Sequence, residues 1–382
     1  MRVLIDYRPA LRERTGVGEY THQLVKALLA AYPPDATAHE LTLSLFSSSW
    51  KDRLMPAAEL AGAAIIDRRI PVRLLNLSWH RLEWPAAETL AGGPFDVTHS
   101  SHPLLMPSPA AAQVVTIHDV NFLSNPERTR AEIRRDYPAL ARDHANRADG
   151  ILVSSAFTAG EVERVLGVPR DRIAVGPPGA PDWTPRAAAP KDGYVLFFGT
   201  LEPRKNVGGL LDAYERLLSG AGPRGVPELV LAGQATDEAR PWLERIEQPP
   251  LKGVVRYTGY VEDGKRQALY QGARLLVQPS FEEGFGIPVL EAMSLGIPVV
   301  AANRGSLPEV VGDAGPLVDP ERPDDIANAI ARLLGDDAYA AVCSARGLAR
   351  ARTFSWERTA HGVYDMYRQA IERRARKPRR LG

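Results

Sequence analysis

The stretch FEEGFGIPVLEAMSLGIPVVAANRGSLPE, residues 281–309, decides the fold. An apolar run at 273–279 precedes it and is typical of a buried strand. A glycine-rich turn at 283–286 follows, Pro288 suits the first helical position, and the apolar run from 297 begins another strand. Strand, glycine turn and helix start together predict an anion site, because unpaired backbone N–H groups and the helix dipole converge there.

Two carboxylates, Glu283 and Glu291, flank this helix start. The first lies in the turn and the second in the first turn of the helix, where the helix dipole alone favours an acid. A structural role for Glu291 therefore stays open. Acids beside a phosphate pocket do not bind phosphate, so we interpret both as groups that hold hydroxyls. The ligand inferred is a diphosphate with hydroxyl-bearing rings on both sides, a sugar nucleotide.

Length and composition indicate a globular chain of two domains. At 382 residues the chain is too long for one ordinary core, and its net charge of +1 argues against broad nucleic-acid binding. Cys343 is the only cysteine, which excludes an internal disulfide and suggests a reducing compartment. The apolar run at 2–6 is too short for a signal peptide, and no segment reaches the ~18 apolar residues of a membrane span. We therefore expect a cytoplasmic protein.

Short apolar runs alternate with longer segments of helical periodicity, which predicts parallel sheets with crossover helices. The predicted strands are 2–6, 40–46, 64–67, 97–99, 114–117, 150–154, 173–175, 194–198, 228–232, 254–258, 274–278, 298–301 and 316–318. The fold class is α/β, with two doubly wound, Rossmann-like parallel-sheet domains whose binding loops face each other across a cleft.

A segment rich in proline and glycine, 176–190, has the composition of a connector. We place the domain boundary there. The predicted N-terminal domain is 1–178 and the predicted C-terminal, nucleotide-sugar-binding domain is 190–357.

Two adjacent cations, Arg204 and Lys205, follow the predicted strand 194–198. Such a pair at a strand end can clamp a diphosphate and stabilise charge on a leaving group. Arginine offers a forked contact and lysine a point charge. The alternative is an ordinary solvated basic turn at the start of a helix, although a cation there opposes the helix dipole.

These segments resemble retaining glycosyltransferases of family 4, which have the GT-B fold. Glu283 and Glu291, with seven residues between them, match the family's E-x7-E motif. The resemblance covers nearly the whole chain, and its other segments are GTLEPRKN at 199–206, YTGYV at 257–261, LPEVV at 307–311, VDP at 318–320 and FSWE at 354–357. It implies that a C-terminal helix, 358–382, crosses back to the first domain.

The resemblance also implies roles for the acidic pair and the turn. Glu291 would bind the nucleotide ribose and Glu283 the transferred sugar. Backbone N–H groups of Gly284, Phe285 and Gly286 would contact sugar hydroxyls and phosphate, because glycine permits a close approach.

The family's base-binding loop falls on Tyr260 and Val261, for which plain packing at a strand end is the alternative. One position departs from the pattern. Many relatives carry arginine directly after the strand glycine, where this chain has Thr200, so Arg204 is expected to replace it.

In the first half, Gly16 and Gly18 lie in RTGVGEYT, residues 14–21, between the first strand and a helix. Any tight turn favours glycine there, and the GxGxxG spacing of dinucleotide-binding proteins is absent. By resemblance, the two glycines belong to a loop that closes over the donor phosphates and approaches the acceptor.

His118 and Asp119 end the apolar run 114–117, where a polar pair at the carboxyl end of a parallel strand points toward the binding region. The alternative is a histidine bonded to backbone. The resemblance makes His118 an active-site group that contacts the donor sugar. Residues 99–102, His-Ser-Ser-His, follow another strand end and either line the acceptor side or are structural.

Basic and aromatic side chains mix at Arg68, Arg69, Arg73, 79–81 (Trp-His-Arg) and Trp84. This region either approaches a lipid-linked acceptor at the inner face of an anionic membrane or forms a solvated face.

The basic C-terminal run 373–380 has the same two alternatives, and a disordered tail is a third.

The function predicted is that of a retaining glycosyltransferase that needs no metal and no cofactor. No D-x-D triplet occurs, which fits Arg204 and Lys205 in place of a metal ion. GDP-mannose is the first choice of donor, with UDP-glucose and UDP-N-acetylglucosamine open. The acceptor is a saccharide or lipid-linked saccharide in polysaccharide biosynthesis. The alternatives are an inactive scaffold that binds sugar nucleotides, or another GT-B activity such as a sugar-nucleotide epimerase.

Overall fold

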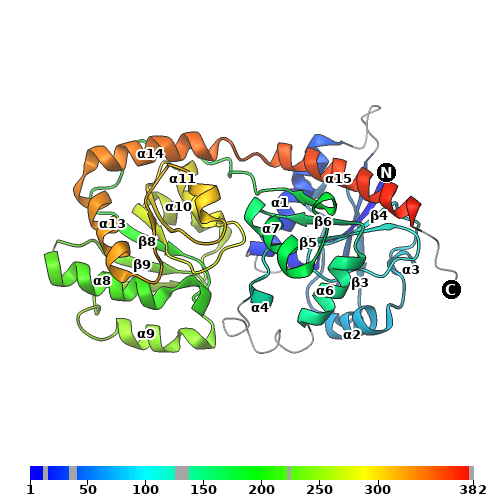
Figure 1. Ribbon diagram of the computed structural model, residues 1–382, viewed down its shortest axis with the longest axis horizontal. Coiled ribbons are helices and arrows are strands. Elements are labelled where there is room, and N and C mark those ends of the chain that lie inside the picture. Colours follow the sequence, from blue (N-terminus) through cyan, green and yellow to red (C-terminus); the bar gives the residue numbers. More distant parts are fainter. Residues whose placement is uncertain (12–15, 34–40, 125–136, 222–224, 378–382) are drawn as a thin grey trace. The chain divides into compact units, whose positions relative to one another are not determined.

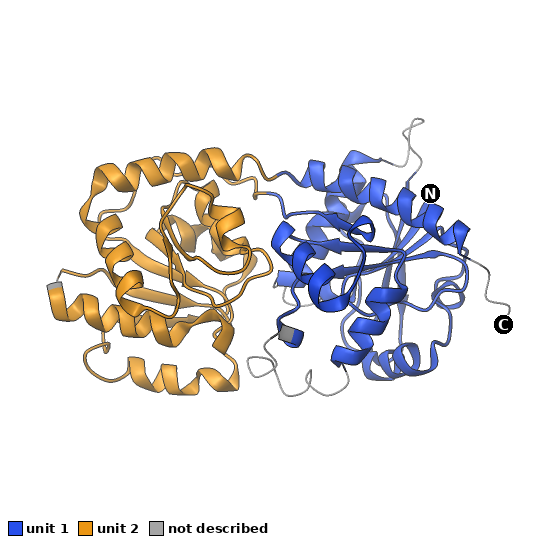
Figure 2. Ribbon diagram, in the orientation of Figure 1, with its two compact units in different colours: residues 1–179, 355–382 blue, residues 180–354 orange. Residues whose placement is uncertain are grey.

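The computed structural model describes residues 1–11, 16–33, 41–124, 137–221 and 225–377. The chain divides into two compact units, shown in Figure 2. Unit 1 comprises Met1–Gly179 and Ser355–Gly382, and unit 2 comprises Ala180–Phe354. Residues 180–189 of the predicted connector thus belong to unit 2, and residues 355–357 belong to unit 1.

Unit 1 contains a parallel sheet of seven strands in the order β3-β2-β1-β4-β5-β6-β7. The strands are β1 (Arg2–Asp6), β2 (Thr42–Ser48), β3 (Ala64–Arg68), β4 (Val97–Ser100), β5 (Ala112–Ile117), β6 (Gly150–Val153) and β7 (Ile173–Val175). Its α-helices are α1 (Gly16–Ala31), α2 (Val72–Leu77), α3 (Ala87–Ala91), α4 (Asn121–Ser124), α6 (Tyr137–Arg147), α7 (Ala156–Leu166) and α15 (Trp356–Arg376), and its short helices are η1 (Arg8–Ala10), η2 (Ala58–Leu60), η3 (Ser78–Leu82) and η5 (Arg170–Arg172).

Side chains of unit 1 alternate between two cores, as the two-residue period of a strand requires. Along β1, Val3 and Ile5 pack with α1 and α15, whereas Leu4 packs on the opposite face with Trp79. Figure 1 shows α15, the last helix of the chain, lying beside α1. Its Tyr367 hydroxyl is 2.6 Å from a ring nitrogen of His99 on β4, so the C-terminal helix is part of unit 1.

Unit 2 contains a parallel sheet of six strands in the order β10-β9-β8-β11-β12-β13. The strands are β8 (Tyr194–Phe198), β9 (Leu229–Ala232), β10 (Val255–Gly259), β11 (Ala273–Gln278), β12 (Val299–Ala302) and β13 (Leu317–Val318). Its helices are η6 (Pro203–Lys205), α8 (Val207–Ala221), η7 (Asp237–Ala239), α9 (Arg240–Ile246), α10 (Asp263–Gln271), α11 (Ile287–Ser294), α12 (Leu307–Val311), α13 (Pro323–Gly335) and α14 (Asp337–Ala351).

The sheet of unit 2 is also covered on both faces. Val195 and Phe197 of β8 pack with α8 and α13, while Leu196 between them packs with α11 and α12. Both units are therefore doubly wound α/β layers, and the predicted fold class is confirmed. Each of the thirteen predicted strands is present with its ends shifted by two residues or fewer, apart from the predicted start at Glu40, which lies outside the described residues.

Each sheet has one point where the strand order reverses, and loops at such a point form the binding crevice of doubly wound proteins. In unit 1 this point lies between β1 and β4, and in unit 2 between β8 and β11. Within the described residues, no helix combines the length and the apolar character that a bilayer span requires.

Candidate functional site

The loops that follow β8 and β11 meet at the switch point of unit 2. The two strands pair in parallel, with Leu196 opposite Leu276, so their carboxyl ends lie side by side. The backbone N–H of Phe281 donates a 2.9 Å hydrogen bond to the carbonyl of Arg204, which joins the loops directly. The topology therefore brings the predicted cations and the first predicted carboxylate to one place.

Lys205 and Glu283 form a buried ion pair there. The Lys205 Nζ lies 2.6 Å from both carboxylate oxygens of Glu283, and the two residues are only 8% and 5% exposed. The Glu283 Oε1 also accepts from Gln278 Nε2 at 3.0 Å and from Ser280 Oγ at 2.9 Å. Arg204 approaches the other oxygen at 3.7 Å. Since Lys205 is buried, the alternative of a solvated basic turn is wrong for this residue.

Lys205 and Glu283 each shift the pKa of the other in the direction opposite to the shift caused by burial. Burial alone raises the pKa of Glu283, but the charges of Lys205 and Arg204 and the hydrogen bonds from Lys205 and Ser280 outweigh it and lower the pKa. Burial and the neighbouring Arg204 charge lower the pKa of Lys205 in spite of Glu283. A lysine ammonium has three donors, and two of them point at Glu283, so one remains for an anion in the loop.

Asn206, which follows the pair, fixes the conformation of the first loop. It adopts a left-handed backbone with φ of 56°. Its amide nitrogen donates to the carbonyl oxygens of Pro279 at 3.1 Å and Pro320 at 2.7 Å. Three loops are thus tied together by one side chain.

A second turn supports the backbone of Glu283. Gly305 has φ of +61°, and a Cβ atom there would lie 2.9 Å from both the N and O atoms of Glu283. The neighbouring Ser306 hydroxyl donates to the Glu283 carbonyl at 2.9 Å. Only glycine allows this approach, so the turn between β12 and α12 supports the backbone of Glu283.

The predicted glycine turn forms the N-terminus of α11. Gly286 is the N-cap, with φ of +99°, and a Cβ atom there would lie 2.6 Å from Leu307. Phe285 is buried and packs edge-on against Phe354 at 5.5 Å. No backbone carbonyl of the described residues accepts a hydrogen bond from the amides of Phe285 or Gly286, so both amides are available to an anion at the helix start. Gly284 is buried in the same turn.

Glu291 is placed differently from the prediction. It is the fifth residue of α11, and the first turn holds no acid, so the proposed dipole effect in that turn does not operate. The helix begins earlier than the sequence suggested, at Ile287. Glu291 is buried, and its Oε1 lies 2.6 Å from the guanidinium of Arg266 on α10.

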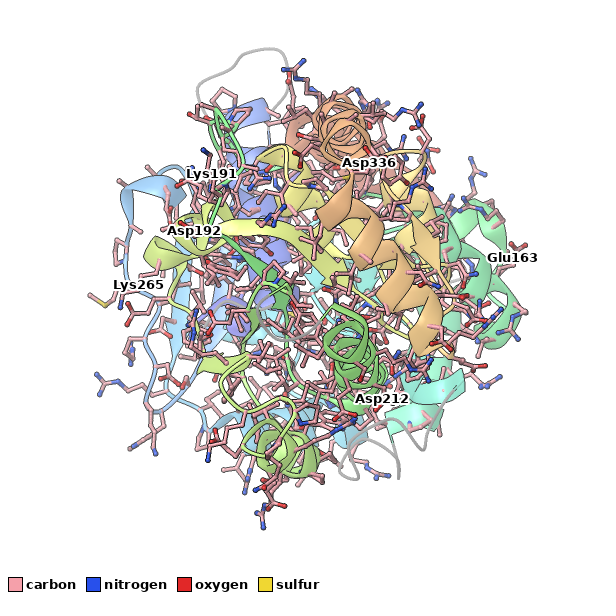
Figure 3. All side chains as sticks on the ribbon, turned by 90° about the vertical axis from the view of Figure 1, so that its left-hand side faces the viewer. Glu163, Lys191, Asp192, Asp212, Lys265 and Asp336 are labelled. Atoms are coloured by element: carbon pink, nitrogen blue, oxygen red, sulfur yellow. The ribbon has the colours of Figure 1, made fainter. Side chains whose placement is uncertain are left out.

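Arg266 was not singled out from the sequence, where it reads as one of several polar residues on a helix. Its neighbour Lys265 projects to solvent at the edge of the view in Figure 3 and pairs with Glu262 at 2.9 Å. Arg266 instead turns inward and stacks over the Phe198 ring at 5.0 Å. The second carboxylate is therefore positioned by a partly buried partner, whose side chain is 13% exposed.

Tyr260 and Val261 follow β10 and are both half-buried. Val261 packs against the core that contains Leu290 and Val299, which supports the packing alternative for this residue. Their assignment to a base-binding loop stays a prediction.

In unit 1, His118 follows the carboxyl end of β5. Its ring packs edge-on against Tyr20, with centroids 5.0 Å apart. Burial lowers the pKa of His118 to about 4, against the opposing effects of Asp119 and a hydrogen bond to the backbone of Ser101. The Nε2 atom is buried and has no hydrogen-bond partner among the described residues. A neutral imidazole with one nitrogen bonded to backbone can accept a hydrogen bond from a hydroxyl at the other.

The structure corrects the predicted loop at Gly16 and Gly18. Both residues belong to the first turn of α1, which begins at Gly16, while residues 14 and 15 lie outside the described residues. A Cβ atom on Gly18 would lie 2.5 Å from the carbonyl oxygen of Pro9. The glycine is needed for close packing of the helix start against η1.

The two histidines of the segment 99–102 are placed differently. His99 is fully engaged, with one ring nitrogen 2.6 Å from the Tyr367 hydroxyl and the other 2.8 Å from Thr116, so it does not line an acceptor site. His102 is partly exposed, and its Nε2 lies 3.3 Å from Asp6.

Asp6 and Arg8 were missed in the sequence, although Asp6 ends β1 at the switch point of unit 1. Arg8 binds both carboxylate oxygens of Asp6, at 2.8 and 2.6 Å. Burial raises the pKa of Asp6, but the charge and hydrogen bonds of Arg8 and those of His102 hold it far below its usual range. An aspartate directly after a buried first strand is the signal that could have revealed this pair.

Comparison with known proteins agrees with this geometry. A family model described as "Glycosyl transferases group 1" matches residues 192–336, and one described as "Glycosyl transferase 4-like domain" matches residues 15–179. The O-antigen chain mannosyltransferase B of Escherichia coli is 34% identical in an alignment that covers 96% of this chain and 100% of that protein.

Two solved structures share the fold. Sucrose-phosphate synthase from Thermosynechococcus elongatus superimposes with a TM-score of 0.76 at 22% identity, over 96% of this chain and 98% of that one. Anabaena HepE, solved in complex with UDP and glucose, gives a TM-score of 0.67 at 18% identity over the same shares. The chain belongs to glycosyltransferase family 4 and has the GT-B fold. It is a hexosyltransferase.

Proposed function

We propose that this protein transfers mannose from GDP-mannose to a saccharide or lipid-linked saccharide in polysaccharide biosynthesis. The observation that carries the proposal is the match, over nearly the whole of both chains, to an O-antigen chain mannosyltransferase. The Lys205–Glu283 pair and the amides at the start of α11 supply the chemistry that a nucleotide-diphosphate sugar requires.

The diphosphate binds at the start of α11 and at the two cations in this proposal. The third donor of Lys205, the Arg204 guanidinium and the amides of Phe285 and Gly286 compensate its charge, and this compensation grows as the bond to the anomeric carbon breaks. Cations and helix dipole act where other transferases use a metal ion, and the reaction needs none.

Configuration is retained in this proposal because the acceptor hydroxyl attacks from the face that the phosphate leaves. The departing phosphate oxygen takes the proton of the acceptor, so no side chain acts as nucleophile. In unit 2, Glu283 orients the sugar through its hydroxyls, and Glu291, held by Arg266, binds the ribose. In unit 1, the buried Nε2 atom of His118 accepts a hydrogen bond from a sugar hydroxyl.

A panel of sugar nucleotides tests the donor. A ligand present at 100 times its dissociation constant stabilises the native state by ~2.7 kcal/mol, which a thermal-shift assay resolves. GDP-mannose is expected to stabilise the protein more than UDP-glucose, UDP-N-acetylglucosamine or ADP-glucose. Glu291→Gln should remove this shift, while the matched exposed variant Glu262→Gln should keep it. A larger shift with a UDP-sugar would refute the choice of donor.

Turnover tests the rest of the proposal. Release of GDP should require an acceptor and should persist in EDTA, and the mannosyl product should keep the α configuration by NMR. Nucleotide binding without acceptor-dependent release would instead identify a scaffold. Loss of turnover in EDTA would refute metal independence.

A further inference from the structure

Large exposed apolar side chains are concentrated in one part of unit 1. Among the described residues, Leu74, Leu77, Leu82 and Trp84 are 60%, 60%, 71% and 70% exposed. All four lie in or directly after the continuous helical segment formed by α2 and η3, residues 72–82. Such a cluster of apolar side chains on the surface marks an interaction site.

This helical segment is apolar on two sides. Leu75 and Trp79, four residues apart, point into the core with Phe46 and are almost fully buried. Leu74 and Leu77 lie on the other side, where a helix of a globular protein normally carries polar residues. The sequence grouped Trp79 with the surface aromatics, and this was wrong because its ring packs inside and its Nε1 donates to the Pro85 carbonyl at 2.9 Å.

The surface is cationic as well as apolar. Arg68, Arg69, Arg73 and Arg81 are exposed around it. Neither Arg69 nor Arg73 forms an ion pair with a described carboxylate. The one acid within the segment that joins η3 to α3, Glu83, pairs with Arg147 at 2.6 Å. The net charge of this face is therefore clearly positive.

A neighbouring loop extends the same surface. Trp50 and Met55, which are also exposed, follow β2, and β2 pairs in parallel with β3. The backbone N–H of Ser49 donates to the carbonyl of Arg68 at 3.2 Å, so the loop and the start of the α2 segment share one end of the sheet.

The segment is also tied to the switch point of unit 1. Asn76 on α2 accepts a 2.8 Å hydrogen bond from Arg8, and the Arg8 guanidinium stacks over the Trp79 ring at 5.0 Å. Arg8 in turn holds Asp6 at the end of β1. A ligand surface on α2 and η3 is therefore connected through Arg8 to the switch point of unit 1.

We propose that α2, η3 and Trp84 form a docking surface for an anionic lipid bilayer. Leucines and a tryptophan insert at the level of the headgroups while the arginines bind lipid phosphates, as in interfacial helices. Positive charge beside exposed apolar residues matches an anionic membrane surface and argues against an apolar protein groove, which would leave the arginines without acidic partners. This inference does not depend on the identity of the donor.

Vesicle sedimentation tests it with the full chain. Wild type should sediment with vesicles of phosphatidylcholine and phosphatidylglycerol in equal parts, and not with phosphatidylcholine alone. Each arginine near an anionic surface contributes about a fivefold factor in binding, so Arg69→Gln with Arg73→Gln should weaken it about 30-fold. Leu74→Ser, Leu77→Ser and Trp84→Ser together should weaken it at least about tenfold.

Matched controls separate docking from folding. Val342→Ser and Arg352→Gln change one exposed apolar residue and one exposed cation in unit 2 and should leave vesicle binding unchanged. All variants should keep the wild-type unfolding midpoint, because the exchanged side chains are exposed. Equal sedimentation with both vesicle types, or full binding by the triple variant, would overturn the proposal. Absence of any sedimentation would overturn it too.

Discussion

The buried pair of Lys205 and Glu283 allows a quantitative prediction on stability. We consider Lys205→Met, Glu283→Gln and the double variant. Both single variants are expected to lose several kcal/mol of unfolding free energy, and the double variant to regain most of it. The reason is that each charge is tolerated in the interior only because of the other.

The magnitude follows from the geometry. At 2.6 Å and an effective dielectric constant of ~20, two unit charges attract by about 6 kcal/mol. Removing each ion from water costs several kcal/mol, so the intact pair contributes little net stability. Removing one partner loses the attraction and keeps the cost of burying the other, a loss of about 3–5 kcal/mol.

Arg204 makes the two losses unequal. In Lys205→Met it still lies 3.7 Å from Glu283 and partly compensates that charge, which gives a loss of about 3 kcal/mol. In Glu283→Gln it repels the remaining Lys205, which raises the loss. Deprotonation of the lysine limits this loss. Removing the proton at pH 7 from a group whose ordinary pKa is 10.5 costs about 3.5 pKa units, or about 5 kcal/mol at 1.36 kcal/mol per unit.

Urea unfolding of the full chain, followed by circular dichroism, measures these differences. The matched control is the exposed pair Lys265 and Glu262, 2.9 Å apart, where the same changes should cost at most about 0.5 kcal/mol. The double variant at 205 and 283 should lie within ~2 kcal/mol of wild type. Additive single losses, or a smaller loss for Glu283→Gln than for Lys205→Met, would refute the reasoning.

The pH dependence gives an independent readout of the same pair. The pKa of Glu283 is lowered from its ordinary value of 4.5, so its contribution is fully present above that value. As the pH falls below 4.5, the unfolded chain takes up the proton first, and the contribution is lost as the pH passes through the lowered native pKa. The stability difference between wild type and Glu283→Gln should therefore shrink in acid, as urea midpoints at falling pH would show.

Three further changes probe the support of the site. Gly305→Ala should lower the free energy of unfolding in urea by about 2–3 kcal/mol, because its φ of +61° is strained for alanine and the new Cβ atom would lie 2.9 Å from backbone atoms. The control Gly253→Ala has a positive φ but open space around it, and should cost only about 1 kcal/mol. Asn206→Gly keeps the left-handed backbone but loses two bonds to carbonyls, and should cost about 1–3 kcal/mol by the same assay, a loss that Asn206→Ala should exceed. Arg266→Gln should raise KM for GDP-mannose about tenfold with little change in kcat, since it positions a carboxylate that binds donor and transition state alike. An unchanged KM, or full activity loss in Arg266→Lys as well, would contradict this role.

Most of the fold was accessible from the sequence because strands buried on both faces appear as short continuous apolar runs. The observed strand ends differ from the predicted ones by up to two residues where polar residues extend a strand, as Ser47 and Ser48 do in β2. The start of α1 was not accessible, since the pattern TGVGEY reads equally well as a loop. The structure shows that Gly18 serves a close contact with Pro9 inside a helix.

The partners of the site residues were harder to predict than the residues themselves. Lys205 and Glu283 are 78 positions apart, and each was expected at the end of a strand. Their contact depends on β8 and β11 being neighbours, which is a property of strand order and not of either local pattern. Arg266 is similar, because only the packing of α10 against α11 distinguishes it from the solvated Lys265 beside it.

The two cations of the site are not equivalent in the structure. Arg204 pairs with Glu202 at 2.7 Å, and both side chains are partly exposed, so this pair can exchange partners at little cost. Lys205 cannot leave Glu283 without stranding a buried charge. An incoming diphosphate would therefore draw Arg204 away from Glu202. It would also accept a hydrogen bond from the third donor of Lys205, which would stay in place. On this argument the lysine and its carboxylate form the fixed base of the site, which is why their double variant should be stable and yet unable to bind the donor.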